Sequence, residues 1–510
     1  MRPKKRLAET PSYVGRRPAA AGRGADASDV EVVIASPRKV SPVSGTEETS
    51  LSPRAASPEP SAPGPRRGLK RDTAVAVATG LAIQAVLILT GTLVARMLGP
   101  DGRGYLAALI LWPWVITLFG NLGIPSALTY SIARDPSASR TLARWGLGFA
   151  LPQTLLLIGL QAIWLLLILH GDPAPVRDAG WLTLGLVPAL LAQQYGLGLL
   201  QGHLRLRIFN ALRLLPWVLY ALGVAVLFAV GERAILPIIA VLLTAFLISG
   251  TTCLVCGLRF SRGDGTPSVD RRFLLSFGLR GLLSSFSAVD VFRPDQVVLA
   301  LFLAPADLGL YVVGLAFTNL PYFIAKSVGL TTFPWVASRS EQGDARRTMW
   351  SLVWLTTGIA VVLVAGLCAT AHWLVPFFFG GEFSDAVTVT YIVLPGMVFL
   401  CTRRVLSEGL KGRGYPLTGT LGELLSLAWV AVALAVFVPL WGINGAAVAL
   451  ASSYVVSLLL LLVLAARHGE LESAGRSLLS LPRDLIRAAR GSGRPPEVAL
   501  QETDRPARVS

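Results

Sequence analysis

The chain has 510 residues, of which 53% are hydrophobic and only 15% are charged, and its mean hydropathy is +0.60. Soluble domains carry roughly 25% charged residues, so this composition excludes an ordinary soluble enzyme. The net charge of +16 would suggest nucleic-acid binding in a soluble chain, but Lys and Arg lie mainly between apolar runs and in the two tails, as membrane topology requires. We therefore expect a polytopic membrane protein and no nucleic-acid partner.

The first segment, residues 1–71, is rich in Pro, Ser, Ala and Arg and contains no sustained apolar run. Such a segment cannot bury enough apolar surface to offset the entropy lost on folding, which predicts a disordered tail. No apolar run follows Met1, so a cleaved signal peptide is not expected. The tail is therefore expected to stay in the cytoplasm.

The next part of the chain contains repeated apolar runs, each long enough to cross a hydrocarbon core of roughly 30 Å at about 1.5 Å per helical residue. The hydropathy pattern predicts about 12 transmembrane helices, near 73–96, 105–128, 146–169, 180–201, 209–230, 234–258, 273–302, 309–336, 348–371, 385–406, 417–438 and 443–465. With the N-terminus inside, the inner loops hold 14 Lys or Arg and the outer loops hold four, namely Arg96, Arg103, Arg177 and Arg233. This bias predicts that both termini are cytoplasmic.

The expected domain organisation is an N-lobe over residues 72–258, a C-lobe over 259–466 and a cytoplasmic C-terminal tail over 467–510. Within this tail, residues 475–490 place leucines among arginines, a pattern suited to an amphipathic helix on an anionic membrane surface. The loops are too short to fold as a separate catalytic domain. Any function is therefore expected within the helix bundle.

An internal repeat relates the two predicted lobes. The segment Leu98–Gly104 ends the first expected span and Leu303–Gly309 ends the seventh, and their prolines and glycines are 205 residues apart. At an offset of 210, Leu200–Gly202 matches Leu410–Gly412. The predicted fold is therefore all-α, with two six-helix lobes related by a parallel pseudo-twofold repeat around a central cavity.

Charged side chains inside the seventh span are the main candidates for function, because each costs about 2.5–3.5 kcal/mol at a helix centre on insertion scales. This span contains Arg280, Asp290, Arg293 and Asp295. Asp290 and Arg293 are three residues apart and would share a helix face. We predict that Arg280 and Arg293 bind an anionic headgroup and that Asp290 and Asp295 balance the charge or carry a coupling proton. The alternative is a structural ion pair near the outer interface.

Two further charged residues lie in later spans. Lys326, in the eighth, is expected to complete the cationic substrate site, and Glu423, in the eleventh, to balance charge or take part in coupling. The four cysteines and four histidines show neither metal-ligand spacing nor a triad pattern, and no phosphate-binding GxxxxGK[ST] loop occurs. We expect no catalytic residues, no metal and no cofactor, and hence a transporter and not an enzyme.

The stretch Ala95–Gly104 (ARMLGPDGRG) resembles the first-loop signature of the polysaccharide biosynthesis proteins. These are the Wzx-type oligosaccharide flippases of the multidrug/oligosaccharidyl-lipid/polysaccharide exporter superfamily. Further segments similar to the family, in order along the chain, are FRPDQ at 292–296, APADLGLY at 304–311, FGGEFSDA at 379–386, LKGRG at 410–414 and PLWGINGAA at 439–447.

This resemblance implies a two-lobed bundle that alternates between inward-open and outward-open states. It would move an undecaprenyl-diphosphate-linked oligosaccharide across the bacterial cytoplasmic membrane, for O-antigen, capsule or exopolysaccharide biosynthesis. The implied partners are this lipid-linked oligosaccharide, membrane lipids, a polysaccharide polymerase and glycosyltransferases. Arg293 and Asp295 match the family's charged seventh helix most closely, whereas Arg280 matches by position only. The long N-terminal tail and Pro294 depart from the family pattern.

Other functions stay open at this point. A cation-coupled multidrug exporter of the same superfamily would favour an acidic cavity, whereas this chain has more basic candidates in its spans. A lipid II flippase usually has two extra helices, which the hydropathy pattern does not show. A membrane-embedded glycosyltransferase or ligase would need a large outer loop or acidic metal-binding motifs. A purely structural scaffold would not need charges inside its seventh helix.

Overall fold

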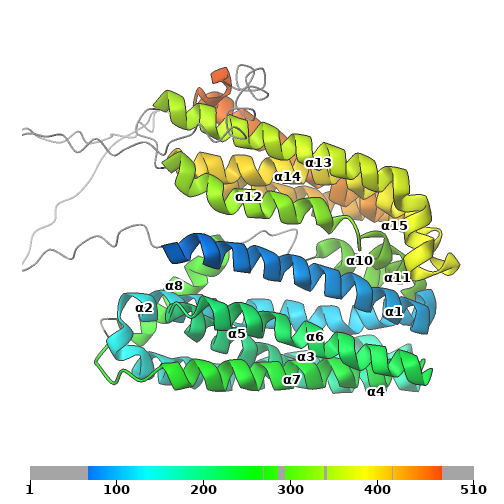
Figure 1. The fold of residues 1–510 in the computed structure, drawn as a ribbon. Coiled ribbons are helices and arrows are strands. Elements are labelled where there is room, and N and C mark those ends of the chain that lie inside the picture. The colour runs from blue at the N-terminus through cyan, green and yellow to red at the C-terminus, as the bar shows by residue number, and fades with distance from the viewer. Residues whose placement is uncertain (1–66, 268, 285–292, 338–341, 416, 474–510) are drawn as a thin grey trace, which may run out of the picture. The chain divides into compact units, whose positions relative to one another are not determined.

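The computed structural model describes residues 67–473 apart from 268, 285–292, 338–341 and 416. Within these residues it consists of α-helices, short 3-10 turns and loops, with no strand (Figure 1). Most of the predicted N-terminal tail, and the surface helix expected over 475–490, lie outside the described residues. The first helix begins at Arg67, slightly before the end of the predicted tail.

The helices confirm an all-α membrane fold. They are α1 (Arg67–Gly120), α2 (Ile124–Arg134), α3 (Ser139–Ile168), α4 (Ala174–Leu182), α5 (Leu186–Gly202), α6 (Leu206–Val230), α7 (Ile235–Phe260), α8 (Arg271–Ser284), α10 (Pro294–Phe302), α11 (Pro305–Gly314), α12 (Asn319–Ala337), α13 (Gln342–Phe379), α14 (Ala386–Gly412) and α15 (Leu417–Arg467). In this part of the chain, eight helical segments are long and apolar enough to cross a membrane, or up to nine if the pair α11–α12, bent by 51°, is one span. The count of twelve stays a prediction.

Two long helices are interrupted by a glycine at the places where the sequence predicts short loops between spans. Gly99 divides α1 with φ +65°, and Gly442 divides α15 with φ +54°. Residues with a Cβ rarely adopt this left-handed region, so glycine allows the chain to change direction there without strain. Pro100 follows Gly99 directly and suits the first position of the new helical segment.

The helices pack around two large apolar clusters. One cluster buries side chains of α1 and α3–α7, including Tyr220 and Phe246. The other buries side chains of α10, α11, α13, α14 and α15, including Tyr311 and Tyr454. Figure 1 shows the corresponding grouping of α3–α7 and of α12–α15. The exact lobe limits, 72–258 and 259–466, stay predictions.

The seventh predicted span differs most from expectation. The sequence predicts one helix over 273–302, but Arg293 has φ +47° and ψ +51°, outside the helical region, and it caps α10. Pro294 explains much of this break, because proline disfavours helical geometry at the residue before it. Residues 285–292 lie outside the described residues. The continuous helix face on which Asp290 and Arg293 were expected to pair therefore does not extend to Arg293.

The two parts of this span contact different helices. On α8, the ring of Phe277 stacks on Tyr130 of α2 with centroids 4.6 Å apart, and Gly278 lies against Gly123. In contrast, α10 packs against α15 and α11. The two parts of the predicted span thus pack against different helices, α8 against α2 and α10 against α11 and α15.

The end of the last helix is held by a buried carboxylate. Glu470, whose side chain is 1% exposed, accepts hydrogen bonds from Arg413 of α14 at 2.8 Å and from Arg346 of α13 at 3.2 Å. Its backbone carbonyl accepts a 2.7 Å bond from the indole N–H of Trp350. These contacts fix the chain after α15 to the ends of α13 and α14.

Candidate functional site

Two arginines from distant parts of the chain line one cavity of about 460 Å³, named the central cavity below. Arg103 lies on the second part of α1, and Arg293 lies at the start of α10. Trp114 and Trp217 line the same cavity, with ring planes stacked at a centroid distance of 6.0 Å. Both arginines also line a smaller, overlapping pocket of about 210 Å³.

The arginines give the central cavity a positive charge. The Nε of Arg103 is buried and has no hydrogen-bond partner among the described residues. Neither Arg103 nor Arg293 forms an ion pair within this part of the chain. A buried guanidinium nitrogen without a hydrogen-bond partner is unfavourable, so an anionic ligand would stabilise Arg103 in this arrangement.

Sequence analysis missed Arg103, because hydropathy placed it in an outer loop. The structure shows that the loop is reduced to the turn at Gly99 and that helix resumes at once. The signal that indicates this is Pro100, since proline is common at the first position of a helix. With helix starting there, Arg103 falls in the first turn and can face the interior.

Asp295 lies in the first turn of α10 and is 2% exposed. Its Oδ2 accepts a 2.7 Å hydrogen bond from the hydroxyl of Tyr311 on α11. Its Oδ1 is buried without a hydrogen-bond partner in the described residues. Asp295 and Arg293 line a polar pocket of about 210 Å³ together with Gln84. The structure thus brings together Arg293 and Asp295, and Arg293 lines both this pocket and the central cavity.

Of the other predicted residues, the structure describes the side chains of Lys326 and Glu423. Arg280 lies on α8, but its side chain is outside what the structure describes, and Asp290 lies outside the described residues altogether. Lys326 on α12 is exposed and lines none of the cavities described above.

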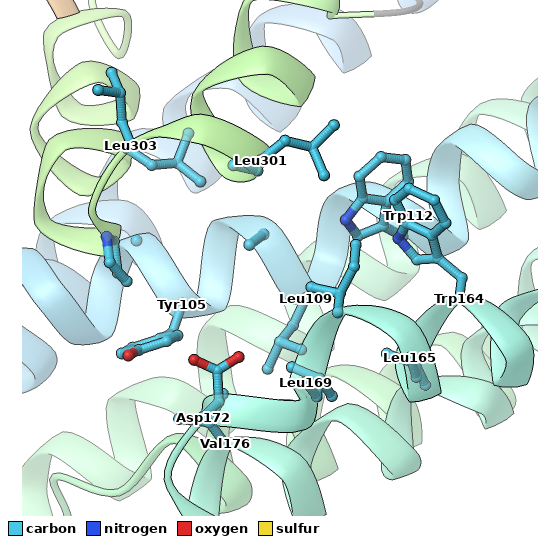
Figure 2. Close-up of a pocket in the computed structure, with 16 residues that line it drawn as sticks. Tyr105, Leu109, Trp112, Trp164, Leu165, Leu169, Asp172, Val176, Leu301 and Leu303 are labelled. Atoms are coloured by element: carbon cyan, nitrogen blue, oxygen red, sulfur yellow. The ribbon is translucent and has the colours of Figure 1, made fainter. Parts of the chain in front are cut away.

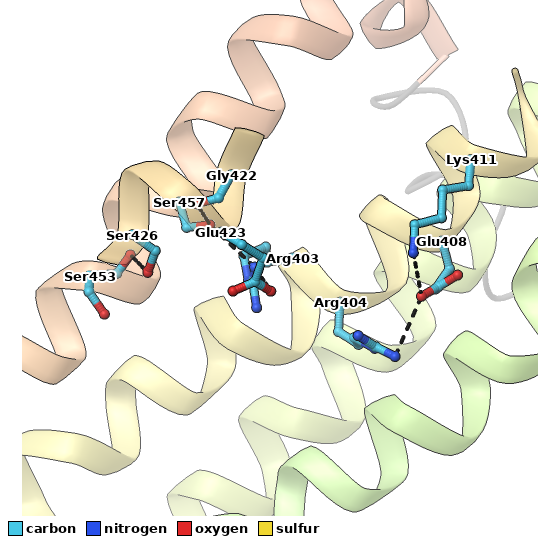
Figure 3. Close-up of polar contacts among 9 residues, drawn as sticks. All are labelled: Arg403, Arg404, Glu408, Lys411, Gly422, Glu423, Ser426, Ser453 and Ser457. Atoms are coloured by element: carbon cyan, nitrogen blue, oxygen red, sulfur yellow. Dashed lines mark hydrogen bonds and ion pairs between the residues drawn. The ribbon is translucent and has the colours of Figure 1, made fainter. Parts of the chain in front are cut away.

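Glu423 on α15 instead forms a buried ion pair with Arg403 of α14, with 2.5 Å between the carboxylate oxygen and the guanidinium nitrogen. The same nitrogen lies 3.4 Å from the hydroxyl of Ser457, which donates to the carbonyl of Gly422 at 3.0 Å. Figure 3 shows these contacts between α14 and α15, with the more exposed cluster of Arg404, Glu408 and Lys411 beside them. The Glu423 charge is balanced locally, away from the central cavity.

A second, largely apolar pocket of about 350 Å³ lies beside α1, and we call it the lateral pocket. Figure 2 shows it between Leu301 and Leu303 on one side and Leu109, Trp112 and Trp164 on the other. The rings of Trp112 and Trp164 are in contact, with centroids 4.2 Å apart. Asp172, Tyr105 and the indole N–H groups of the two tryptophans are the polar side-chain groups of its lining.

The predicted repeat segments cross each other closely and reciprocally. A Cβ added at Gly104 would lie 1.6 Å from the carbonyl oxygen of Pro305, and one added at Gly309 would lie 2.1 Å from the carbonyl oxygen of Pro100. The two glycines and the two prolines are the pairs that the 205-residue offset relates. This reciprocal crossing of α1 and α11 therefore has the pseudo-twofold character that the sequence predicts.

Known proteins resemble this chain in sequence and in fold. Residues 69–340 match the family model for polysaccharide biosynthesis proteins. The chain is 21% identical over 272 residues to the probable low-salt glycan biosynthesis flippase Agl15 of Haloferax volcanii, a match over 52% of this chain and 57% of that protein. The chain thus spans somewhat more than half the length of this curated relative.

Solved transporter structures share the fold at low sequence identity. The lipid II flippase MurJ in an inward closed conformation has a TM-score of 0.62 at 13% identity, over 80% of this chain and 92% of that one. An inward-facing multidrug resistance MATE family transporter of the MOP superfamily has a TM-score of 0.58 at 13% identity, over 82% of this chain and all (100%) of that one. The described helices have this two-lobed transporter fold. Because the family model matches more than half of the chain, the chain belongs to the polysaccharide biosynthesis protein family.

Proposed function

We propose that this protein is a flippase that moves an undecaprenyl-diphosphate-linked oligosaccharide across the bacterial cytoplasmic membrane, for O-antigen, capsule or exopolysaccharide biosynthesis. The observation that carries the proposal is the pair Arg103 and Arg293 in the central cavity, without an ion-pair partner in the described part of the chain. A diphosphate offers several anionic oxygens, and the planar guanidinium group binds such oxygens in pairs. Family membership supports the same substrate class.

The proposal places both termini in the cytoplasm and the turn at Gly99 at the outer surface. The distribution of Lys and Arg between alternate loops supports this orientation. Arg103 follows Gly99 by four residues, so it lies about 6 Å along the helix from that turn. The headgroup would then enter from the cytoplasm and reach Arg103 near the outer end, while the N-lobe and the C-lobe rearrange around it.

Asp295 has a distinct role in this proposal. It shares a pocket with Arg293, and one of its oxygens has no hydrogen-bond partner among the described residues. We assign it to balancing the charge of Arg293 when no substrate is bound, and to releasing Arg293 when it takes up a proton. The partners would be the lipid-linked oligosaccharide, membrane lipids, and the polymerase and glycosyltransferases that use or make this lipid.

A multidrug exporter is the second candidate, because stacked Trp114 and Trp217 line the central cavity and aromatic faces attract cations. Arg103 and Arg293 line the same space, however, and would repel a cationic drug. An anionic headgroup therefore suits the cavity better.

The test is a deletion of the gene, followed by extraction of undecaprenyl-linked oligosaccharides and an assay of the leaflet that holds them. We expect accumulation in the inner leaflet and loss of surface polymer. Arg103→Ala and Arg293→Ala should each fail to restore the polymer, because a lost charge-assisted contact costs about 1.5–3 kcal/mol. Arg140→Ala is the matched control, since Arg140 pairs with Asp264 at an exposed site. Normal lipid intermediates together with new drug sensitivity would refute the proposal and indicate a multidrug exporter.

A further inference from the structure

The lateral pocket has the size and lining of a site for an apolar chain. Its volume of about 350 Å³ lies within the range of ligand pockets, roughly 300–1,000 Å³. Most of its lining is aliphatic, including Leu109 of α1, Leu165 of α3 and Leu308 of α11. It is formed by helices from both halves of the sequence, at the seam where α1 meets α10 and α11 (Figure 2).

The mouth of this pocket lies on a surface of exposed apolar residues. Leu301 lines the pocket and is 42% exposed, and the next residue, Phe302, is 75% exposed. On α3, next to Trp164, Ile163 and Leu167 are also largely exposed. In a membrane-spanning bundle such residues contact lipid, so a lipid chain can enter this pocket without crossing water.

Helices α1 and α10 line both cavities, and α1 does so with two different faces. Along α1, Arg103 and Trp114 line the central cavity, whereas Leu109 and Trp112 line the lateral pocket. At about 100° per residue, these positions fall on roughly opposite sides of the helix. On α10, Gln296 lines the central cavity, and Ala300, one turn further along the same face, lines the lateral pocket. A cationic site and an apolar site therefore lie on the two sides of one seam.

The chemistry of the lateral pocket excludes the other parts of the proposed substrate. Asp172 in its lining would repel a diphosphate. Most of its lining is aliphatic and offers few hydrogen-bond partners for the hydroxyl groups of a sugar. An apolar chain is the remaining part, and its own headgroup would lie across the seam, at Arg103.

We propose that the lateral pocket binds the part of the substrate's prenyl chain nearest the diphosphate, on the membrane side of the seam, and so favours prenyl diphosphates over the surrounding phospholipid. This inference rests on the proposed function, because it takes the diphosphate at the two arginines as given. It adds a second binding site, for the lipid end of the same molecule.

The first experiment fills the pocket and measures binding to the full chain in phosphatidylglycerol nanodiscs. Ala300→Phe places a ring into the pocket, and Val362→Phe, at a 72% exposed position on α13, is the control. The probes are undecaprenyl diphosphate and inorganic diphosphate, which share the charged group but differ in the prenyl chain. We expect Ala300→Phe to weaken undecaprenyl diphosphate binding about tenfold, as the loss of a few buried methylene contacts would. Binding of inorganic diphosphate should change less than about twofold, which also shows that the variant is folded.

The outcomes separate this inference from the proposed function. Arg103→Ala should weaken the binding of both probes, and if neither probe binds the unaltered protein, the proposed function itself fails. If both probes bind, but undecaprenyl diphosphate binds Ala300→Phe as tightly as it binds Val362→Phe, the prenyl site is refuted and the flippase proposal stands.

A second experiment identifies the occupant directly. A benzophenone side chain at position 301, at the pocket mouth, should crosslink to the prenyl chain of added lipid-linked diphosphate under light. Crosslinking to phospholipid alone, undiminished by a saturating amount of the prenyl lipid, would show a pocket for bulk lipid and overturn the inference.

Discussion

The reciprocal crossing of α1 and α11 allows a direct test of whether a helix contact keeps one end of the bundle closed. In Gly104→Ala the new methyl carbon would lie 1.6 Å from the carbonyl oxygen of Pro305, whereas ordinary contact begins at 3.4 Å. The helices must therefore move apart by the difference between these distances, about 1.8 Å, because backbone atoms on both sides cannot rotate away. Overpacking of this kind typically costs about 1–3 kcal/mol. Such a cost would shift the equilibrium between arrangements that are closed and open at the Gly99 end by roughly 5- to 150-fold.

If the crossing holds the Gly99 end closed, Gly104→Ala should favour the arrangement that is open at this end. The assay uses Ala107→Cys, at the central cavity, in a chain whose four cysteines are replaced, with a maleimide that does not cross membranes. Labelling from the outside should be at least about fivefold faster in Gly104→Ala. Gly148→Ala on α3 is the control, since nothing lies within 4 Å of its added Cβ. Equal labelling rates and equal melting temperatures in both variants would refute the reasoning.

Three further predictions concern stability, measured by thermal unfolding. Arg403→Ala leaves the carboxylate of Glu423 without its ion-pair partner at a buried site, and should lower the free energy of unfolding by about 3–5 kcal/mol. Glu470→Ala removes the buried carboxylate between two arginines. It should lower the free energy of unfolding by a similar amount, about 3–5 kcal/mol. Burial, and then the charge of Arg205, lower the pKa of His203 below 6.5. The neutral imidazole is therefore favoured in the folded protein, and the stability that it contributes is complete above pH 6.5. This stability is lost as the pH falls from 6.5 through the lowered pKa of the folded protein. His203→Gln should therefore lose less stability than the unaltered protein between pH 7.5 and pH 5.

Each of these predictions has a result that contradicts it. Arg403→Met combined with Glu423→Leu should recover most of the loss, so a double variant no better than Arg403→Ala would argue against the ion pair as the cause. Glu470→Gln, which keeps the shape, should unfold at a temperature between those of Glu470→Ala and the unaltered protein. An identical pH dependence of stability with and without His203 would show that its protonation does not matter for folding.

The apolar helices were predictable because hydropathy and length decide whether a segment can span a membrane. The turns at Gly99 and Gly442 fall where the sequence predicts loops, and in the case of Gly99 the following proline marks the start of the next helical segment. The crossing of α1 and α11 could also be predicted in outline, since a parallel repeat brings equivalent segments together around its axis. These features depend on local composition or on symmetry, and both can be read from one sequence.

The details of the site depend on packing that a single sequence does not show. Hydropathy placed Arg103 in a loop, because it cannot distinguish a short loop from the first turn of a helix. The positive φ of Arg293 changes which residues share a face with it, although Pro294 gave a signal for the break. Glu423 was expected to serve the substrate site, and its contact with Arg403 arises only when α15 packs on α14.

The reciprocal crossing at Gly104 and Gly309 also bears on how such a chain can arise. Each half contributes one glycine and one proline carbonyl, so two copies of a single helical unit could make both contacts with one and the same surface. Duplication and fusion of the unit would then need no new interface at this end of the bundle. After the fusion, residues that face lipid or substrate can change independently in the two halves. Each glycine, in contrast, must still fit against the proline carbonyl of the other half. We expect the residues at these two positions to vary together among related chains, because a larger residue at either position needs a wider crossing of the two helices.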